Sequence, residues 1–230
     1  MTYCHLDTEE IRRFKEEYTL EDLKSWFKEL VHRYEKWARL QIEWERMRDE
    51  TIRNLKFPFP YREGQFNLAA SVYRTIARKK KLFIQAPTGT GKTMAVLYPA
   101  VRAMGEGLGE KIFYLTARTI TRTVAEQAFF ILKEKGLKFR SVTLTAKEKI
   151  CFCEKAECNP QACPYAKGHF DRVNDAVYDL LKNGGGMGRK EIEEQAQKFQ
   201  ICPFEFALEL SVWQMGLSVI IITYLIQMHI

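Results

Sequence analysis

The stretch FIQAPTGTGKT, from Phe83 to Thr93, decides the fold. It leads from an apolar run through a loop that contains two glycines into a helix-favouring segment. A strand, a glycine-containing loop, a Lys-Thr pair and a helix in this order are the context of a phosphate-binding Walker A loop. Ala86 stands where that motif usually has its first glycine. The alternative interpretation is an ordinary glycine-containing turn before a helix.

The residue types of this loop suit the binding of a phosphate chain. Gly89 and Gly91 permit backbone conformations that a side chain would penalise, so successive N–H groups can turn inward around a phosphate. The dipole of the following helix adds to the attraction. Lys92 is predicted to reach the β- and γ-phosphates of ATP, and Thr93 to ligate Mg²⁺, as the catalytic pair. The predicted nucleotide-binding residues of the loop are Thr88, Gly89, Thr90, Gly91, Lys92 and Thr93.

Short apolar runs around the loop predict a parallel sheet that is buried on both faces. Helices are expected over Thr93–Met104 and Thr119–Lys135, as crossovers between parallel strands. This alternation predicts an α/β fold. The runs are Lys81–Pro87, Lys111–Ala117, Arg140–Ala146 and Ser218–Tyr224.

Length and composition set broad limits. The 230 residues have room for one α/β domain with additions. The longest apolar candidate, Leu217–Ile222, is far shorter than the roughly 18 residues of a membrane span. The N-terminus has no basic segment followed by an apolar core, so we expect no membrane partner and a cytoplasmic location. Lys and Arg exceed Asp and Glu by 36 to 29, a small excess that suits a polyanionic partner.

The first zone of the chain, to about Asn54, is charged and predicted to be helical. Thr19 and Asp22 resemble a capping box. The apolar stripe behind it predicts either packing on its own domain or a dimerising coiled coil. A Pro- and Gly-containing segment, Lys56–Gly64, then predicts a domain boundary. The stripe consists of Leu23, Phe27, Leu30, Tyr34 and Trp37.

Five of the six cysteines fall between Cys151 and Cys202, with the spacing C-x-C-x4-C-x4-C-x38-C. In a reducing compartment this clustering favours a metal site over a disulfide framework. Three close thiolates and one distant thiolate suit either a tetrahedral zinc or an iron–sulfur cluster. The spacing leaves both open, together with unliganded thiols.

Several segments together resemble the iron–sulfur superfamily 2 DNA helicases of the DinG and XPD type. They are YREGQ, QAPTGTGKT, YLTART, the cysteine-rich KICFCEKAECNPQACPYAKGHFDRVND and CPFEFALELSVW, between Pro60 and Trp213. The resemblance implies a P-loop NTPase with a RecA-like parallel sheet, a cysteine-rich helical insert and an N-terminal helical extension. It implies the cofactors ATP, Mg²⁺ and a [4Fe–4S] cluster, and single-stranded DNA or DNA junctions as partners.

The same resemblance assigns roles to residues. Gln65 matches the glutamine that reads adenine, with Tyr61 or Arg62 near the base. Thr116 and Arg118 match a segment that contacts the backbone of single-stranded DNA. The implied cluster ligands are Cys151, Cys158, Cys163 and Cys202, with Cys153 as a spare and a competing first ligand.

One end of the chain extends the resemblance, and the other departs from the family pattern. The segment TYCHLDTEEIRRFKEEYTLEDLKSWF resembles the tail of a fused PD-(D/E)XK nuclease module. At the other end the expected DEAH box is absent, so we expect an incomplete first motor domain, a truncated or frameshifted reading frame and a chain that is inactive alone as an ATP hydrolase. The alternatives are a zinc-binding nucleic-acid module and a non-helicase ATP-binding regulator. The oligomeric state stays open. The predicted domains are residues 1–57, the helical extension; 58–150, the first part of the ATP-binding domain; 151–203, the iron–sulfur insert; and 204–230, the return to the sheet.

Overall fold

The computed structural model describes residues 2–87, 89–116, 119–183, 187–213 and 216–220. The chain divides into two compact units, Met1–Glu43 and Trp44–Ile230. The predicted division into residues 1–57, 58–150, 151–203 and 204–230 stays a prediction. Among the described residues, no helix has both the length and the apolar character that crossing a bilayer requires.

The first unit holds a small hairpin and the start of the long helix α1, Leu20–Asn54. Strands β1, Thr2–Cys4, and β2, Ile11–Arg13, pair antiparallel. The helical prediction for the first zone is wrong for residues 2–13, which form this hairpin. Sequence patterns do not predict it, because its strands are short and exposed and show no burial alternation.

The capping box at the start of α1 is confirmed. The backbone N–H of Thr19 donates to Asp22 Oδ2 at 3.1 Å, and the N–H of Asp22 donates to Thr19 Oγ1 at 3.2 Å. The hydrogen bonds from Thr19 also lower the pKa of Asp22. Leu23, Phe27 and Leu30 of the predicted stripe are exposed. The two interpretations of that stripe therefore both stay open.

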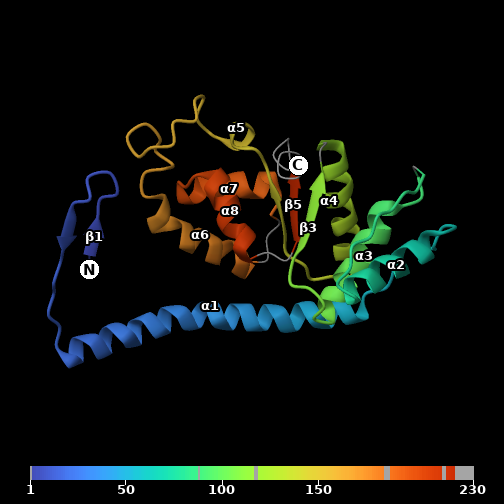
Figure 1. Cartoon of the computed structure of the whole chain (residues 1–230), viewed down its shortest axis with the longest axis horizontal. Coiled ribbons are helices and arrows are strands. Elements are labelled where there is room, and N and C mark those ends of the chain that lie inside the picture. The colour runs from blue at the N-terminus through green and yellow to red at the C-terminus, as the bar shows by residue number, and fades with distance from the viewer. Residues whose placement is uncertain (1, 88, 117–118, 184–186, 214–215, 221–230) are drawn as a thin grey trace. The chain divides into compact units, whose positions relative to one another are not determined.

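In the second unit three parallel strands form one sheet, with β5 between the other two. They are β3, Ile112–Thr116, β4, Ser141–Leu144, and β5, Gly216–Ile220. Figure 1 shows β5 beside β3, with α4 next to them. The predicted strands at 111–117 and 140–146 are confirmed. The prediction that the sheet is buried on both faces is wrong for β3, because its Phe113 and Leu115 side chains are exposed. The strand predicted at 218–224 is confirmed as far as Ile220, and its remainder lies outside the described residues.

The strand predicted over Lys81–Pro87 is wrong for this structure, which has irregular backbone there. A strand needs a neighbour to pair with its backbone N–H and C=O groups. The described strands pair only among themselves, in the order β3-β5-β4. The apolar run consequently stays unburied, and the Phe83 side chain is 94% exposed.

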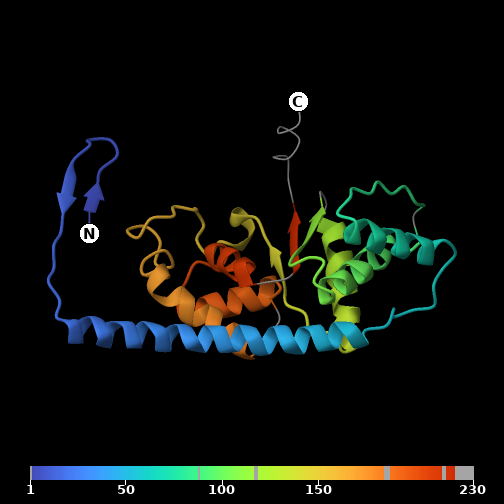
Figure 2. The ribbon, with the colours of Figure 1, turned by 60° about the horizontal axis from the view of Figure 1, so that its bottom comes forward.

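Helices on either side of the phosphate-binding loop match the expected pattern. The helices predicted over 93–104 and 119–135 are confirmed as α3, Lys92–Gly105, and α4, Thr119–Glu134. Helix α2, Gln65–Ala77, packs against α3, and α3 also contacts α4. Figure 2 shows α2 and α3 side by side. Helix α3, which begins directly after the loop, therefore packs between α2 and α4.

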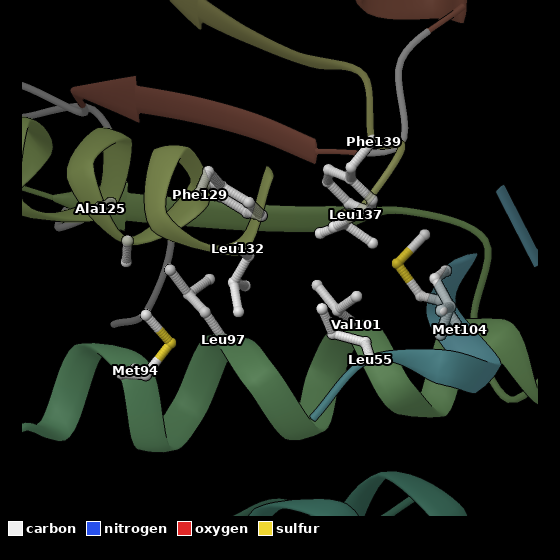
Figure 3. Packing of buried hydrophobic residues seen from close by; sticks show 12 residues of the cluster. Leu55, Met94, Leu97, Val101, Met104, Ala125, Phe129, Leu132, Leu137 and Phe139 are labelled. Carbon is white, nitrogen blue, oxygen red and sulfur yellow. The ribbon is translucent and has the colours of Figure 1, made fainter. Parts of the chain in front are cut away.

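The core of this region lies between α3, α4 and the end of α1. Met94, Leu97 and Val101 of α3 point toward Ala125, Phe129 and Leu132 of α4 (Figure 3). Their spacing of three and four residues places them on one helix face. The whole cluster comprises Ile52, Leu55, Met94, Leu97, Val101, Met104, Ala125, Ala128, Phe129, Leu132, Leu137 and Phe139.

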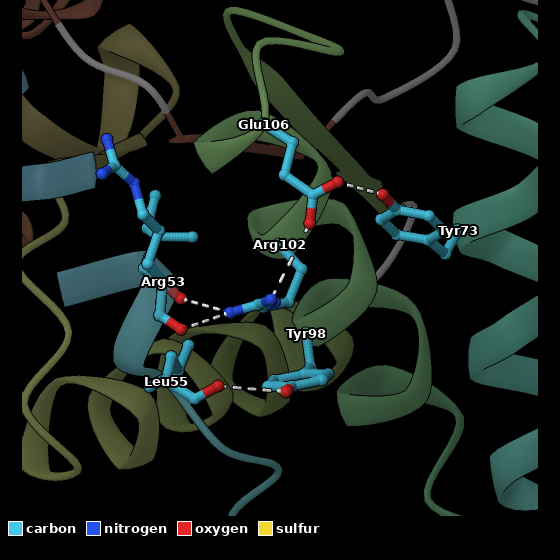
Figure 4. Close-up of polar contacts among 7 residues, drawn as sticks. Arg53, Leu55, Tyr73, Tyr98, Arg102 and Glu106 are labelled. Carbon is cyan, nitrogen blue, oxygen red and sulfur yellow. Dashed lines mark hydrogen bonds and ion pairs between the residues drawn. The ribbon is translucent and has the colours of Figure 1, made fainter. Parts of the chain in front are cut away.

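Polar contacts fix the last turn of α1 to α3. The Arg102 guanidinium donates to the carbonyls of Ile52 and Arg53, both at 2.8 Å. The Tyr98 hydroxyl donates to the Leu55 carbonyl at 3.1 Å (Figure 4). The last carbonyls of a helix have no N–H group in a following turn to accept from, so these side chains supply hydrogen-bond donors to them.

The cysteine-containing region has a helical core of its own. Short helix α5, Lys147–Ile150, precedes it. Helices α6, His169–Asn183, α7, Arg189–Phe199, and α8, Pro203–Trp213, pack on one another, and α8 also contacts β4. Their buried residues include Val173, Val177, Ile192, Ala196, Phe206 and Leu210.

Candidate functional site

The phosphate-binding loop adopts the backbone that its glycines predict. Gly89 has φ +85° and Gly91 has φ +71°, both in the left-handed region that an L side chain disfavours. Gly91 is the residue immediately before α3, so Lys92 and Thr93 begin the helix. The N–H groups of the first helical turn lack intrahelical partners and attract anions. The loop can therefore bind a phosphate group at this helix end.

The Lys92 side chain is turned back onto its own loop. Its ammonium group donates to the carbonyls of Ala86, at 2.7 Å, and Pro87, at 2.6 Å. The Thr90 hydroxyl also donates to the Pro87 carbonyl, at 3.0 Å. Since an ammonium has three donors on a flexible stem, it can exchange these carbonyls for phosphate oxygens without a change in the helix. Thr93 is half-buried in the first turn.

Gln65 lies against this loop although 26 positions separate it from Gly91 in sequence. Its side chain is buried, and its Nε2 donates to the Gly91 carbonyl at 3.2 Å. Its Oε1 accepts from the backbone N–H of Arg62 at 3.0 Å. A side-chain amide has a second N–H and a second lone pair, so capacity remains for another polar group. The structure thus brings Gln65, Gly91 and Lys92 together.

Arg62 adds a contact that sequence reasoning missed. Its guanidinium donates to the carbonyl of Gly89, inside the loop. Tyr61 beside it stacks on Phe57 with ring centroids 4.1 Å apart, and burial raises its pKa. Arg62 therefore contacts the loop directly. The placement of Tyr61 or Arg62 near the adenine base, which the resemblance implies, stays a prediction.

The predicted DNA-contact residues are only partly described. Thr116 ends β3 and is buried, with 7% of its surface exposed. Arg118 lies outside the described residues, as does Thr88 of the loop. The DNA-contact role of Thr116 and Arg118 stays a prediction.

Five cysteines line one cavity of about 300 Å³. Cys151, Cys153, Cys158 and Cys163 come from the segment between α5 and α6, and Cys202 immediately precedes α8. The structure thus gathers all four predicted ligands, although 38 residues separate the last two. The fifth thiol, Cys153, is in the same cavity, with its Sγ 3.8 Å from Cys163 Sγ.

Electrostatics at the cavity depend on these thiols and one lysine. The hydrogen bond with Cys163 is the largest cause that raises the pKa of Cys153, to about 11. Burial raises the pKa of Cys202. Lys147 Nζ lies 3.6 Å from Cys158 Sγ. Burial lowers the pKa of Lys147, but the negative charges of Cys158, Glu205 and Cys202 outweigh it and the net direction is upward. A lysine ammonium thus lies beside Cys158 at this cavity.

The cysteine thiols of this cavity can be compared with the needs of a zinc ion and of an iron–sulfur cluster, the two groups that the spacing left open. Zinc bonds of about 2.3 Å to sulfur would draw four thiols into one tight tetrahedron. Among the described residues, no group of three or more His, Cys, Asp or Glu side chains has an arrangement that could hold a single metal ion. Five thiols line the cavity, and both candidate groups are bound through sulfur.

One further cavity residue, His169, had no sequence signal. It begins α6, is 3% exposed, and its Nδ1 accepts from the backbone N–H of Cys202 at 3.3 Å. A histidine six positions after Cys163 does not by itself predict this contact, because only the fold brings Cys202 to it.

Comparisons with known proteins match the part of the chain that contains the phosphate-binding loop. Residues 67–158 match the family model of the DEAD/DEAH box helicase. An alignment of 195 positions, 45% identical, relates 68% of this chain to a "Probable ATP-dependent helicase" of the archaeon Methanocaldococcus jannaschii. The chain spans about 30% of that relative's length. The matched segment contains the phosphate-binding loop and Cys151, Cys153 and Cys158, and it begins two residues after Gln65. The part of the chain that contains the phosphate-binding loop is therefore similar to this helicase family.

Proposed function

We propose that this chain is the ATP-binding part of a DNA helicase of the iron–sulfur type similar to DinG and XPD. The observation that carries the proposal is the convergence of Gln65 and Lys92 on one loop at the start of α3. The matches to the DEAD/DEAH box helicase and to the archaeal relative support it. ATP binding, DNA binding and a cytoplasmic location belong to this proposal, and ATP hydrolysis is the reaction proposed for the helicase as a whole.

In this proposal Lys92 leaves the carbonyls of Ala86 and Pro87 and contacts the β- and γ-phosphates of ATP. Thr93 supplies its hydroxyl to Mg²⁺, and the N–H groups of Thr88 to Thr90 surround the phosphates. Gln65 reads the adenine edge. Because its amide also donates to the Gly91 carbonyl, a movement of Gln65 toward the base would also affect the conformation of the loop.

Adenine preference tests this assignment. The full chain is titrated with Mg-ATP and Mg-GTP, and Gln65→Ala is compared with Gln197→Ala, a change on the exposed side of α7. We expect a preference for ATP in the wild type and in Gln197→Ala, and equal affinities in Gln65→Ala. Equal binding of ATP and GTP by the wild type would contradict the role of Gln65.

DNA binding is proposed to run over the end of β3, through Thr116 and Arg118. Contacts to phosphates are independent of sequence and weaken with salt. Fluorescence anisotropy with a labelled single-stranded oligonucleotide measures the salt slope. Arg118→Ala is expected to reduce the slope by about one. An unchanged slope would remove Arg118 from the DNA path.

The cysteine cavity is proposed to hold a [4Fe–4S] cluster through Cys151, Cys158, Cys163 and Cys202. Cys153 is a spare thiol that competes with Cys151 as the first ligand. Five thiols around one cavity, with Lys147 as a nearby cation, support this. When bound, the cluster supplies a cross-link between the segment before α6 and the start of α8, and one-electron chemistry.

The second candidate is a zinc site in a nucleic-acid-binding module. The separation of 3.8 Å between Cys153 and Cys163 Sγ favours it, because two thiolates on one zinc are this close. Anaerobic purification followed by metal and acid-labile sulfide analysis separates the two. Iron and sulfide in equal amounts support the cluster, and one zinc per colourless chain supports the alternative.

A further inference from the structure

His169 is a buried side chain with an unused polar atom at the cysteine cavity. It is 3% exposed and lines the same cavity as the five cysteines. Within the described residues, its Nε2 is buried and has no hydrogen-bond partner. Leaving a buried donor or acceptor unpaired costs about 1–3 kcal/mol, so such an atom points to a missing partner.

The other ring nitrogen decides which kind of partner is missing. The backbone N–H of Cys202 donates to His169 Nδ1 at 3.3 Å, so Nδ1 presents its lone pair to that N–H. An imidazole whose Nδ1 accepts a hydrogen bond carries its proton on Nε2. Nε2 is therefore a donor, and it lacks the free lone pair that a metal ligand needs.

The position of the ring is fixed by the neighbouring structure. Arg172, one turn further along α6, donates to the carbonyls of Phe199 at 2.9 Å and Gln200 at 2.6 Å. These carbonyls lie just before Cys202, so Arg172 ties the start of α6 to the segment that carries the cysteine. Phe170 packs edge-on against the imidazole at 5.1 Å. The geometry keeps His169 beside Cys202.

We propose that His169 donates a hydrogen bond from Nε2 to a sulfur of the iron–sulfur group that the cysteines hold. This inference rests on the proposed cluster and assigns His169 as a positioning and tuning residue, not as an iron ligand. A hydrogen bond to sulfur stabilises the additional negative charge of the reduced cluster, so it raises the reduction potential. It also gives the buried N–H its partner.

The test uses the full chain, purified anaerobically and reconstituted with ferrous iron and sulfide. His169→Leu removes the donor, His169→Gln retains an N–H donor, and His32→Leu makes the same change at a side chain that is 88% exposed in the other unit. The readouts are iron and sulfide content, and the midpoint potential followed by EPR. We expect full iron in all chains, and about a tenfold loss of electron affinity in His169→Leu, which is about 59 mV to negative potential for a one-electron couple. His169→Gln and His32→Leu are expected at the wild-type potential.

Pulsed EPR of the wild type with ¹⁵N-labelled histidine gives a second readout that does not depend on the folding of His169→Leu. A weak nitrogen coupling, lost in His169→Gln, supports a hydrogen bond to sulfur. A strong coupling typical of a nitrogen bound to iron overturns the proposal, as does an unchanged potential in an iron-replete His169→Leu. A wild-type chain that takes up no iron overturns the proposed cluster and this inference together, whereas an iron-replete wild type without any nitrogen coupling overturns the inference alone.

Discussion

Replacing Gly91 by alanine tests the contact between the phosphate-binding loop and Gln65. An added Cβ would overlap Gln65 Nε2 and lie 3.3 Å from its Cδ. Gln65 would have to move, and its bonds to the Gly91 carbonyl and the Arg62 N–H would break. Two neutral hydrogen bonds are worth about 0.5–1.5 kcal/mol each. The left-handed backbone at φ +71° adds about 1–2 kcal/mol for an L side chain.

The lower chain entropy of unfolded alanine offsets about 0.4–1 kcal/mol of this. Gly91→Ala should therefore lower the free energy of unfolding by about 2–4 kcal/mol, measured by urea denaturation with circular dichroism. Gly89→Ala is the matched control. It has a similar φ, +85°, but nothing lies within 4 Å of its added Cβ, so only the backbone effect of about 1 kcal/mol remains.

A double-mutant cycle isolates the contact. In a Gln65→Ala background the overlap disappears, and Gly91→Ala should then lower stability by no more than Gly89→Ala does. If the two glycine substitutions have equal effects in the wild-type background, or if Gln65→Ala leaves the effect of Gly91→Ala unchanged, the contact between Gln65 and the loop is refuted.

Three further predictions test the fold. Leu97→Ala, at a side chain 1% exposed between α3 and α4, should lower the unfolding free energy by about 2–5 kcal/mol, and Leu108→Ala, 37% exposed, by less than about 1 kcal/mol; equal effects would contradict the packing. Arg102→Ala should lower it by about 1.5–3 kcal/mol and Tyr98→Phe by about 1 kcal/mol, because they remove two bonds and one bond to the end of α1; the reverse order would refute this account of the helix end. Hydrogen bonds from Gln195 and then from Lys198 hold the pKa of Asp179 below 3.8. Its stabilising effect is thus complete above that pH and is lost as the pH falls through the lower folded value. Asp179→Asn should therefore be less stable than the wild type by about 0.5–1 kcal/mol at pH 7, and the difference in urea denaturation should shrink below pH 3.8; a difference that grows in acid would contradict the sign.

Sequence patterns predict those elements whose local signal and tertiary role agree. Helices α3 and α4 have apolar residues at helical spacing, and they bury that face against each other. Strands β3 and β4 are short apolar runs that find β5 as a common neighbour. The run at Lys81–Pro87 has an equally strong local signal but no strand to pair with among the described residues. The strand predicted there is therefore absent, because a strand needs a neighbouring strand that the local sequence does not contain.

The residues of the candidate site also fall into those that local sequence patterns predict and those that they do not. The loop glycines and Lys92 could be predicted, because their spacing is local and its chemistry is specific. The grouping of the cysteines, Cys202 included, was expected from their clustering and the resemblance, and all five line one cavity. Two contacts could not be predicted: the bond from Arg62 to Gly89 and the bond from Cys202 to His169. Both join residues 27 or more positions apart, and neither residue pair has a pattern that a local window contains.

The most direct test of the central claim is the equilibrium titration of the full chain with Mg-ATP by calorimetry. The wild type should bind one Mg-ATP, and Lys92→Ala should bind it at least about tenfold more weakly, because it loses hydrogen bonds from a charged donor. Lys190→Ala, at a side chain 82% exposed on α7, should bind as the wild type does. Equal affinities in the wild type and Lys92→Ala, or no binding by a folded wild type, would contradict the account.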